Sequence, residues 1–300
     1  MKRSWRLSTL LGPTPVARSV SLKLSKVDKL GVIAGAGALP RQIVAACRES
    51  GRAFCVLAFE GSADSEMIGD VPIQWIKMSS LSAALDAARN AGVTELVLVG
   101  KIPRPNVLEL MRDVRSAKFM AKVGTRMLGD DNILSAVVRE LEEVEGFRVI
   151  APETLLENLL STAGTYGVVN PTRDDLADIQ RGLDVVHQIG RLDIGQAAIV
   201  QNGFVIGVEA AEGTDRLVER CADFVSQELP GGVLVKAAKP TQDRRIDLPA
   251  VGLSTVQHVV RAGLRGIAVE TGGALIVDRP EMIRAADAAG IFLFGVSLKN

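Results

Sequence analysis

Apolar positions recur along this chain with two alternating periods, one typical of buried strands and one of amphipathic helices. In the first half, short apolar runs predict strands at 29–37, 53–61, 73–78, 95–102 and 147–152. Helical patterns lie between them at 39–51, 80–92, 106–122 and 131–146. Strands that alternate with helices indicate βαβ units and a parallel sheet, which binds ligands beyond the carboxyl ends of its strands.

The second half predicts another α/β unit, with helices at 173–193, 215–229, 254–263 and 279–290 and strands at 232–238, 266–277 and 291–298. Asn202-Gly203 between two apolar runs predicts a hairpin over 196–210. We therefore expect an α/β fold with an N-terminal Rossmann-like parallel-sheet domain and a C-terminal α/β domain. The expected boundaries are 27–158 and 169–300, with a linker at 159–168. Residues 1–26, which contain Lys and Arg but no acid, are expected to be a disordered extension or an upstream misassigned start.

The composition of the chain excludes several classes of protein. The chain has 300 residues, of which 47% are hydrophobic and 23% charged, so it can bury a real core. Lys+Arg and Asp+Glu are 35 each, and this balance argues against a nucleic-acid partner held by bulk phosphate neutralisation. Aromatic residues make up only 4%, too few for base-stacking platforms. No apolar run is long enough for a transmembrane helix.

Cysteine and histidine exclude several kinds of site. The 3 cysteines are scattered and form no C-x-x-C pair, so neither a disulfide framework nor a structural zinc site is indicated, and a reducing cytoplasm is expected. The 2 histidines, His187 and His258, are too few for a histidine metal cage. No G-x-S-x-G elbow and no Walker A sequence occurs. The remaining groups, carboxylates, Lys, Arg and glycine turns, suit Mg²⁺-assisted chemistry on phosphate better than acyl transfer.

A glycine turn follows the first predicted strand. Gly35, Gly37 and Ala38 precede a helix, a geometry that holds phosphate through backbone N–H groups and the helix dipole. The alternative is a tight turn without a ligand. A dinucleotide fingerprint would need a glycine where Pro40 stands, and Glu60 is only loosely placed for a ribose, so a nicotinamide cofactor is disfavoured.

Charged residues cluster at four other turns. Lys101 lies at the carboxyl end of the fourth strand and suits an anion, although a rigid βα turn is nearly as good an explanation. Asp130 and Asp131 begin a helix, where a cap is the first explanation and a ribose or metal-bound water the second. Glu212 and Asp215 are hard oxygen ligands of the kind that bind Mg²⁺.

The fourth of these turns is the run "KPTQDRRIDLP" at 239–249, between an apolar strand and a helix. Loops at the ends of buried strands often carry functional groups, and the prolines at both ends would stiffen this one. Its charges, however, could also pair with each other in a solvated turn.

Together with "KLGVIAGAGALP", "GDDNILSAV" and "VEAAEGTDRLVER", the run "KPTQDRRIDLPAVGLSTV" resembles the LpxI family over about residues 27 to 298. The resemblance implies a two-domain enzyme that hydrolyses UDP-2,3-diacylglucosamine to UMP and 2,3-diacylglucosamine 1-phosphate in lipid A biosynthesis. It also implies Mg²⁺, a soluble or peripheral protein at the cytoplasmic face of the inner membrane, and acyl chains sheltered between the domains. It suggests attack at the sugar-side phosphorus. The oligomeric state, a homodimer included, stays open.

On this basis we expect Asp243 to bind Mg²⁺ or to orient the attacking water. Lys239 and Arg245 would neutralise developing charge, and Asp247 would be a second ligand or hold Arg245. The expected metal ligands are Asp243, Glu212 and Asp215. The expected substrate-binding residues are Gly35, Gly37, Ala38, Lys101, Asp130, Asp131, Thr214 and Gln242. The alternatives are a non-catalytic nucleotide-binding regulatory module and an NAD(P)-linked oxidoreductase.

Overall fold

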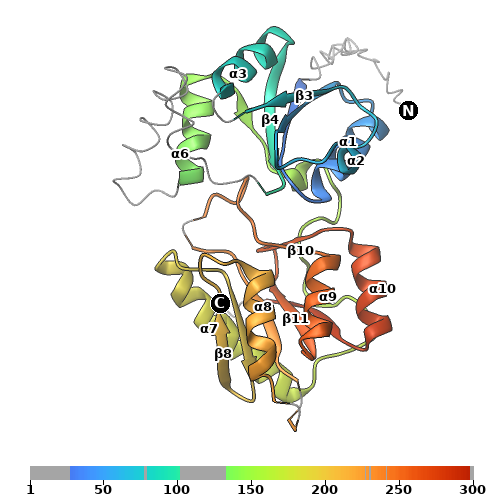
Figure 1. Cartoon of the computed structure of the whole chain (residues 1–300), viewed down its shortest axis with the longest axis vertical. Helices are drawn as coiled ribbons and strands as arrows, with labels where there is room; N and C mark the ends of the chain where they lie inside the picture. The colour runs from blue at the N-terminus through green and yellow to red at the C-terminus, as the bar shows by residue number, and fades with distance from the viewer. Residues whose placement is uncertain are drawn as a thin grey trace, which may run out of the picture.

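The computed structural model of the chain describes residues 28–77, 80–101, 133–226, 228–229, 231–240 and 242–297. These residues form two α/β units, each built on its own sheet, and a small two-stranded sheet at their junction (Figure 1). The predicted helix at 106–122 lies outside the described residues.

The N-terminal sheet is parallel and has the strand order β3-β2-β1-β4-β5. Its strands are β1 (Lys29–Ala34), β2 (Phe54–Phe59), β3 (Ile73–Ile76), β4 (Val93–Val99) and β5 (Arg148–Val149). The side chains of β1 alternate, so that Val32 packs with the helices α1 (Leu39–Glu49) and α2 (Ser65–Ile68). Ile33 packs with α3 (Leu81–Asn90) and α6 (Ile133–Arg139) on the other face. The order of strands reverses between β1 and β4, which is where such sheets bind ligands.

The C-terminal sheet is mixed and has the order β6-β13-β11-β9-β7-β8. Its strands are β6 (Gly164–Thr165), β7 (Ala197–Gln201), β8 (Phe204–Val208), β9 (Val233–Lys236), β11 (Gly266–Glu270) and β13 (Phe292–Val296). The helix α7 (Arg173–Arg191) packs on Val233 and Val235. Helices α8 (Thr214–Cys221), α9 (Leu253–Arg261) and α10 (Arg279–Ala289) pack on Leu234 and the other face.

The α/β fold class is confirmed, with a parallel sheet first and a second α/β sheet after it. The hairpin is also confirmed, because Asn202 and Gly203 turn between β7 and β8 with φ values of 49° and 79°. Two helices are shorter than predicted. The helix predicted at 131–146 changes after Arg139 into a π-helix, η2 (Glu140–Val144).

The helix predicted at 215–229 ends at Cys221 and continues as a 3₁₀ turn, η4 (Ala222–Phe224). The reason is a tertiary contact. The Gln201 side chain accepts a hydrogen bond from the Ser226 N–H and donates one to the Ser226 carbonyl, both at 3.0 Å. These bonds attach the chain to the end of β7, so it leaves the helix.

The segment predicted as a linker contacts both units. After the 3₁₀ turn η3 (Pro152–Thr154), Leu159 enters the core under α1, and Ser161 donates its N–H to the Ala274 carbonyl at 2.8 Å. Gly164–Thr165 then pairs with β13 as an antiparallel edge strand. The segment is therefore held by Leu159, Ser161 and Gly164–Thr165, whereas Val168 near its end is exposed.

The junction of the two units is formed largely by the end of the loop that follows β9. Ile246 packs against the core under α3 and α6, and Leu248 against the core under α1. The loop then enters β10 (Ala250–Val251), which pairs in parallel with β12 (Leu275–Ile276) between the two large sheets (Figure 1). The run 239–249 is thus held by both domains.

Candidate functional site

The two turns at the carboxyl ends of β1 and β4 contact each other directly. The Gly35 N–H donates to the Val99 carbonyl at 2.8 Å, and Ala36 and Lys101 exchange two backbone hydrogen bonds of 2.9 Å. A Cβ on Gly35 would lie 2.4 Å from the Lys101 carbonyl oxygen. Gly35 is therefore required for this close approach, and its N–H is already bonded. In this structure Gly35 shapes the turn and its N–H is bonded to Val99; contact of Gly35 with a phosphate stays a prediction.

The next residues leave the start of α1 open. Gly37 has a φ of 106°, and a Cβ on it would meet nothing within 4 Å. Ala38 is the N-cap and makes no side-chain capping bond. The N–H groups of a first helical turn have no partner inside the helix, so this turn presents donors at the switch point of the sheet.

Replacing Gly35 by alanine should destabilise the protein by about 2 kcal/mol, because the new methyl group forces the two turns apart. A drop in the thermal unfolding midpoint measures this. Gly37→Ala is the matched control: it meets no atom and carries only the strain of its positive φ, of about 1 kcal/mol. An unfolding midpoint of Gly35→Ala equal to that of the wild type would contradict the close approach.

Gln242 organises the loop at 239–249 from inside. The residue is 7% exposed, and its Oε1 accepts the Lys239 N–H at 2.9 Å. Its Nε2 donates to the Asp247 carbonyl and, at 3.3 Å, to Oε1 of Gln196. The amides of Ile246 and Asp247 both donate to the Asp243 carbonyl. In this structure, Gln242 fixes the loop's shape; substrate contact by its side chain stays a prediction.

Asp243 and Arg245 form the central pair of the loop. Arg245 donates from Nε to Oδ1 of Asp243 at 3.0 Å and from Nη2 to Oδ2 at 2.8 Å. It also donates from Nη1 to Oε1 of Glu142 in η2 at 2.8 Å, so it joins the two domains. Burial acts to raise the pKa of Asp243, but the hydrogen bonds and charge of Arg245 outweigh it and hold that pKa below its usual range. The hydrogen bonds to Asp243 raise the pKa of Arg245.

Lys239 lies at the start of the same loop but has a different partner. Its ammonium is 2.7 Å from Oδ1 of Asp193, and its side chain is only 17% exposed. Arg244 donates to the carbonyl oxygen of Gly272. The loop therefore brings Asp243 and Arg245 together, whereas Lys239 is paired with a residue that follows α7.

The start of α8 forms a second charged group at the same junction. Lys236, at the end of β9, is 6% exposed and donates to Oγ1 of Thr214 at 2.9 Å. The Thr214 hydroxyl donates to Glu209 at 2.7 Å. Asp215 lies 3.8 Å from the ammonium of Lys101, which comes from the other domain. The structure thus brings Lys101 to the turn that carries Thr214 and Asp215, which the sequence analysis treated as a separate candidate.

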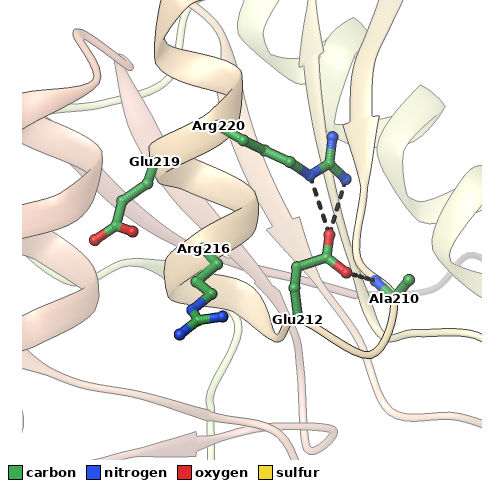
Figure 2. Close-up of a pocket in the computed structure, with 5 residues that line it drawn as sticks. All are labelled: Ala210, Glu212, Arg216, Glu219 and Arg220. Carbon is green, nitrogen blue, oxygen red and sulfur yellow. Dashed lines mark hydrogen bonds and ion pairs between the residues drawn. The ribbon is translucent and has the colours of Figure 1, made fainter.

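Glu212, just before this group in the chain, lies in an open hollow of about 740 Å³ beside α8 (Figure 2). Its carboxylate accepts two hydrogen bonds from Arg220, at 2.9 and 3.1 Å, and one from the Ala210 N–H at 3.2 Å. Backbone hydrogen bonding, followed by that of Arg220, lowers the pKa of Glu212. The wide opening and the paired carboxylate favour a structural role for Glu212.

The predicted Mg²⁺ ligands do not form a cage in the described part of the chain. Within it, no group of three or more His, Cys, Asp or Glu side chains is placed to hold a metal ion. Asp243 is engaged by Arg245 and Glu212 by Arg220, so neither pairs with Asp215. These residues do not fit a preformed metal site, and the Mg²⁺ requirement stays a prediction. Asp130 and Asp131 lie outside the described residues.

Sequence reasoning missed Lys236, Glu209 and Glu142. A signal for Lys236 existed, because it is the one charged residue in the apolar run "GVLVKAA". Glu142 could not be found, since only the π-helix and the contact between domains bring it to Arg245.

Comparisons with known proteins agree with this architecture. The family model of the LpxI N-terminal domain matches residues 29–159, and that of the LpxI C-terminal domain matches 162–294. The UDP-2,3-diacylglucosamine pyrophosphatase LpxI of Caulobacter vibrioides is 39% identical over 274 residues, 89% of this chain and 97% of the relative. The protein is a two-domain α/β enzyme of the hydrolase class. It belongs to the LpxI family.

Two solved structures that match this chain share little sequence with it. A UDP-glucose 4-epimerase complex with NAD from Thermus thermophilus is 17% identical, with a TM-score of 0.31, and covers 90% of this chain and 86% of its own. A leucoanthocyanidin reductase complex with NADPH from Vitis vinifera is 10% identical, with a TM-score of 0.27, and covers 90% and 78%. At these TM-scores the matches carry no argument about fold or cofactor. No helix in the described residues is long and apolar enough to cross a membrane.

Proposed function

We propose that this chain hydrolyses UDP-2,3-diacylglucosamine to UMP and 2,3-diacylglucosamine 1-phosphate, a step of lipid A biosynthesis. The observation that carries the proposal is the 39% identity to the Caulobacter vibrioides enzyme over nearly its whole length. The geometry supports it, because the charged loop at 239–249 lies at the junction of the two domains, where one substrate could contact both.

The reaction needs a water held in line with one phosphorus and positive charge on the phosphate oxygens. We assign the orientation of this water to Asp243. The water oxygen bonds to the phosphorus, the bridging P–O bond breaks, and the water's proton passes to the carboxylate. In this structure Arg245 donates hydrogen bonds to both carboxylate oxygens of Asp243. One of these oxygens must therefore leave Arg245 to accept a hydrogen bond from the water, while Nη1 of Arg245 stays bonded to Glu142. Arg245 would remain as a countercharge.

The other predicted residues take supporting roles in this proposal. The ammonium of Lys239 would leave Asp193 and pair with a phosphate oxygen. The ammonium of Lys101 would likewise leave Asp215 and pair with a phosphate oxygen. Asp247 would help to hold Arg245. The N-terminal domain would bind the uridine phosphate at Gly37 and Ala38, with Asp130 and Asp131 toward the ribose.

We also propose that the reaction requires Mg²⁺. This ion is commonly held by one or two carboxylates together with the substrate's phosphates, and supplies charge neutralisation to them. A site of that kind is complete only with substrate bound. It therefore needs no cluster of three carboxylates in the free protein.

The test is UMP release from UDP-2,3-diacylglucosamine, with Mg²⁺ titrated against EDTA. We expect release that depends on the metal. A run in H₂¹⁸O locates the attack: label in the sugar 1-phosphate means the sugar-side phosphorus, and label in UMP means the other. No release at any Mg²⁺ concentration, with UMP still bound, would instead support a nucleotide-binding regulatory module.

The proposal also states where in the cell the enzyme works. The substrate carries two acyl chains, so we propose that the enzyme works at the cytoplasmic face of the inner membrane, bound to its surface only transiently. The two chains would be sheltered between the domains during the reaction.

A further inference from the structure

Lys236 is an unusual residue for the place it occupies. It ends β9, whose other three residues are Val, Leu and Val with no exposure, and it is itself 6% exposed. Burial of an ammonium group is costly unless it is paired and hydrogen-bonded. Burial lowers the pKa of Lys236, and the charges of Glu209 and Asp215 oppose this effect. A strand end that needed only packing would carry an apolar residue.

The contacts of Lys236 join three separate segments. Its ammonium donates to Oγ1 of Thr214, at the start of α8, and to the Ala250 carbonyl at 3.0 Å, where the loop 239–249 ends. The Thr214 hydroxyl in turn donates to Oε1 of Glu209, after β8. Oε2 of Glu209 accepts the Gln196 N–H at 2.9 Å, before β7.

This chain of hydrogen bonds fixes the orientation of Thr214. A hydroxyl has one proton and two lone pairs. The proton of Thr214 is committed to Glu209 and one lone pair to Lys236, so the hydroxyl cannot rotate. The neighbouring Asp215 then faces Lys101 of the N-terminal domain at 3.8 Å. The start of α8 is thus held from inside the C-terminal domain at the point where the other domain approaches.

We propose that Lys236 is a positioning residue: it holds Thr214 and the end of the loop 239–249 in one arrangement, so that Thr214 and Asp215 meet the substrate beside Lys101. The inference rests on the proposed function and adds a residue to it. Lys236 acts through Thr214 and does not touch the reacting atoms. Its loss should therefore weaken substrate binding more than it slows the chemical step.

The test compares Lys236→Met, which keeps the length and removes the charge and donors, with Lys77→Met. Lys77 is an exposed lysine of the N-terminal domain that pairs with Glu60. For Lys236→Met we expect KM to rise about tenfold or more while kcat changes by less than about threefold, the signature of lost uniform binding. Lys77→Met should match the wild type. Circular dichroism and thermal unfolding establish that each variant is folded.

A double-mutant cycle with Thr214→Val gives the sharper readout. If Lys236 acts through Thr214, the two effects on KM should be clearly less than additive, and the double variant should have about the KM of the weaker-binding single variant, because both changes remove the same arrangement of Thr214. Thr214→Ser keeps the hydroxyl and should stay close to the wild type. If Lys236→Met does not fold, the comparison of Thr214→Val with Thr214→Ser still tests the inference. An unchanged KM for Thr214→Val would overturn it.

The outcomes separate the two proposals. Wild-type UMP release together with an unchanged KM for folded Lys236→Met, or with fully additive effects, would overturn the role of Lys236 and leave the function standing. A wild type without UMP release would overturn the proposed function and this inference together.

Discussion

Asp243→Ala should lower kcat for UMP release by about 10²–10⁴-fold while KM stays within about threefold, because a group that orients the water acts mainly on the chemical step. The fold should survive the change. Gln242 and the Lys239–Asp193 pair still hold the loop, and Arg245 keeps its contact with Glu142. Steady-state kinetics over a range of Mg²⁺ concentrations measure the effect.

The matched control is Asp86→Ala. Asp86 also pairs with an arginine, Arg89 at 2.7 Å, but on α3, away from the loop. It should leave kcat unchanged. Near-wild-type turnover by folded Asp243→Ala would remove Asp243 from the mechanism.

A second comparison distinguishes orientation of the water from mere support of Arg245. If Asp243 only holds Arg245, the double variant Asp243→Ala/Arg245→Ala should be no slower than Arg245→Ala alone. We expect it to be clearly slower, because the two residues have separate tasks in the proposal.

Joining the two domains covalently should abolish most multiple turnover. In the proposal, a substrate with two acyl chains enters between the domains, so the contacts at the junction would have to open. Gln42 in α1 and Asp278 before α10 meet there, with Nε2 and Oδ1 2.5 Å apart. Cysteines at these two positions, linked by a cleavable bis-maleimide, should reduce steady-state UMP release by at least about tenfold, and cleavage of the linker should restore it.

The cross-linking experiment needs a background without competing thiols. Cys47 and Cys221 are buried, but Cys55 is partly exposed and is replaced by alanine. The protein with all three substitutions must be active before the reagent is added, and each variant with only one of the two new cysteines must stay active after treatment. Full multiple turnover by the cross-linked protein would show that opening at this junction is not required.

Local signals in the sequence gave the elements near the site. The hairpin at Asn202-Gly203 followed from residues that accept positive φ, and the turn after β1 from its glycines. The resemblance of "KPTQDRRIDLP" to the LpxI family located the loop that carries Asp243 and Arg245. These two residues are two positions apart, so their pairing is local. Where a tertiary contact competed with a local preference, the prediction was wrong, as at the helix that ends at Cys221 because Gln201 binds Ser226.

The sequence by itself determined the two α/β units, the family and the loop that carries the charged residues. Only the tertiary structure decided what these residues meet. It placed Asp215 beside Lys101, Arg245 on Glu142, and Lys239 on Asp193, pairs that are 114, 103 and 46 positions apart. It also paired Glu212, a predicted metal ligand, with Arg220. The physical reason is that a carboxylate or an ammonium takes whichever opposite charge packing brings near, and packing between distant segments leaves no mark in the local pattern.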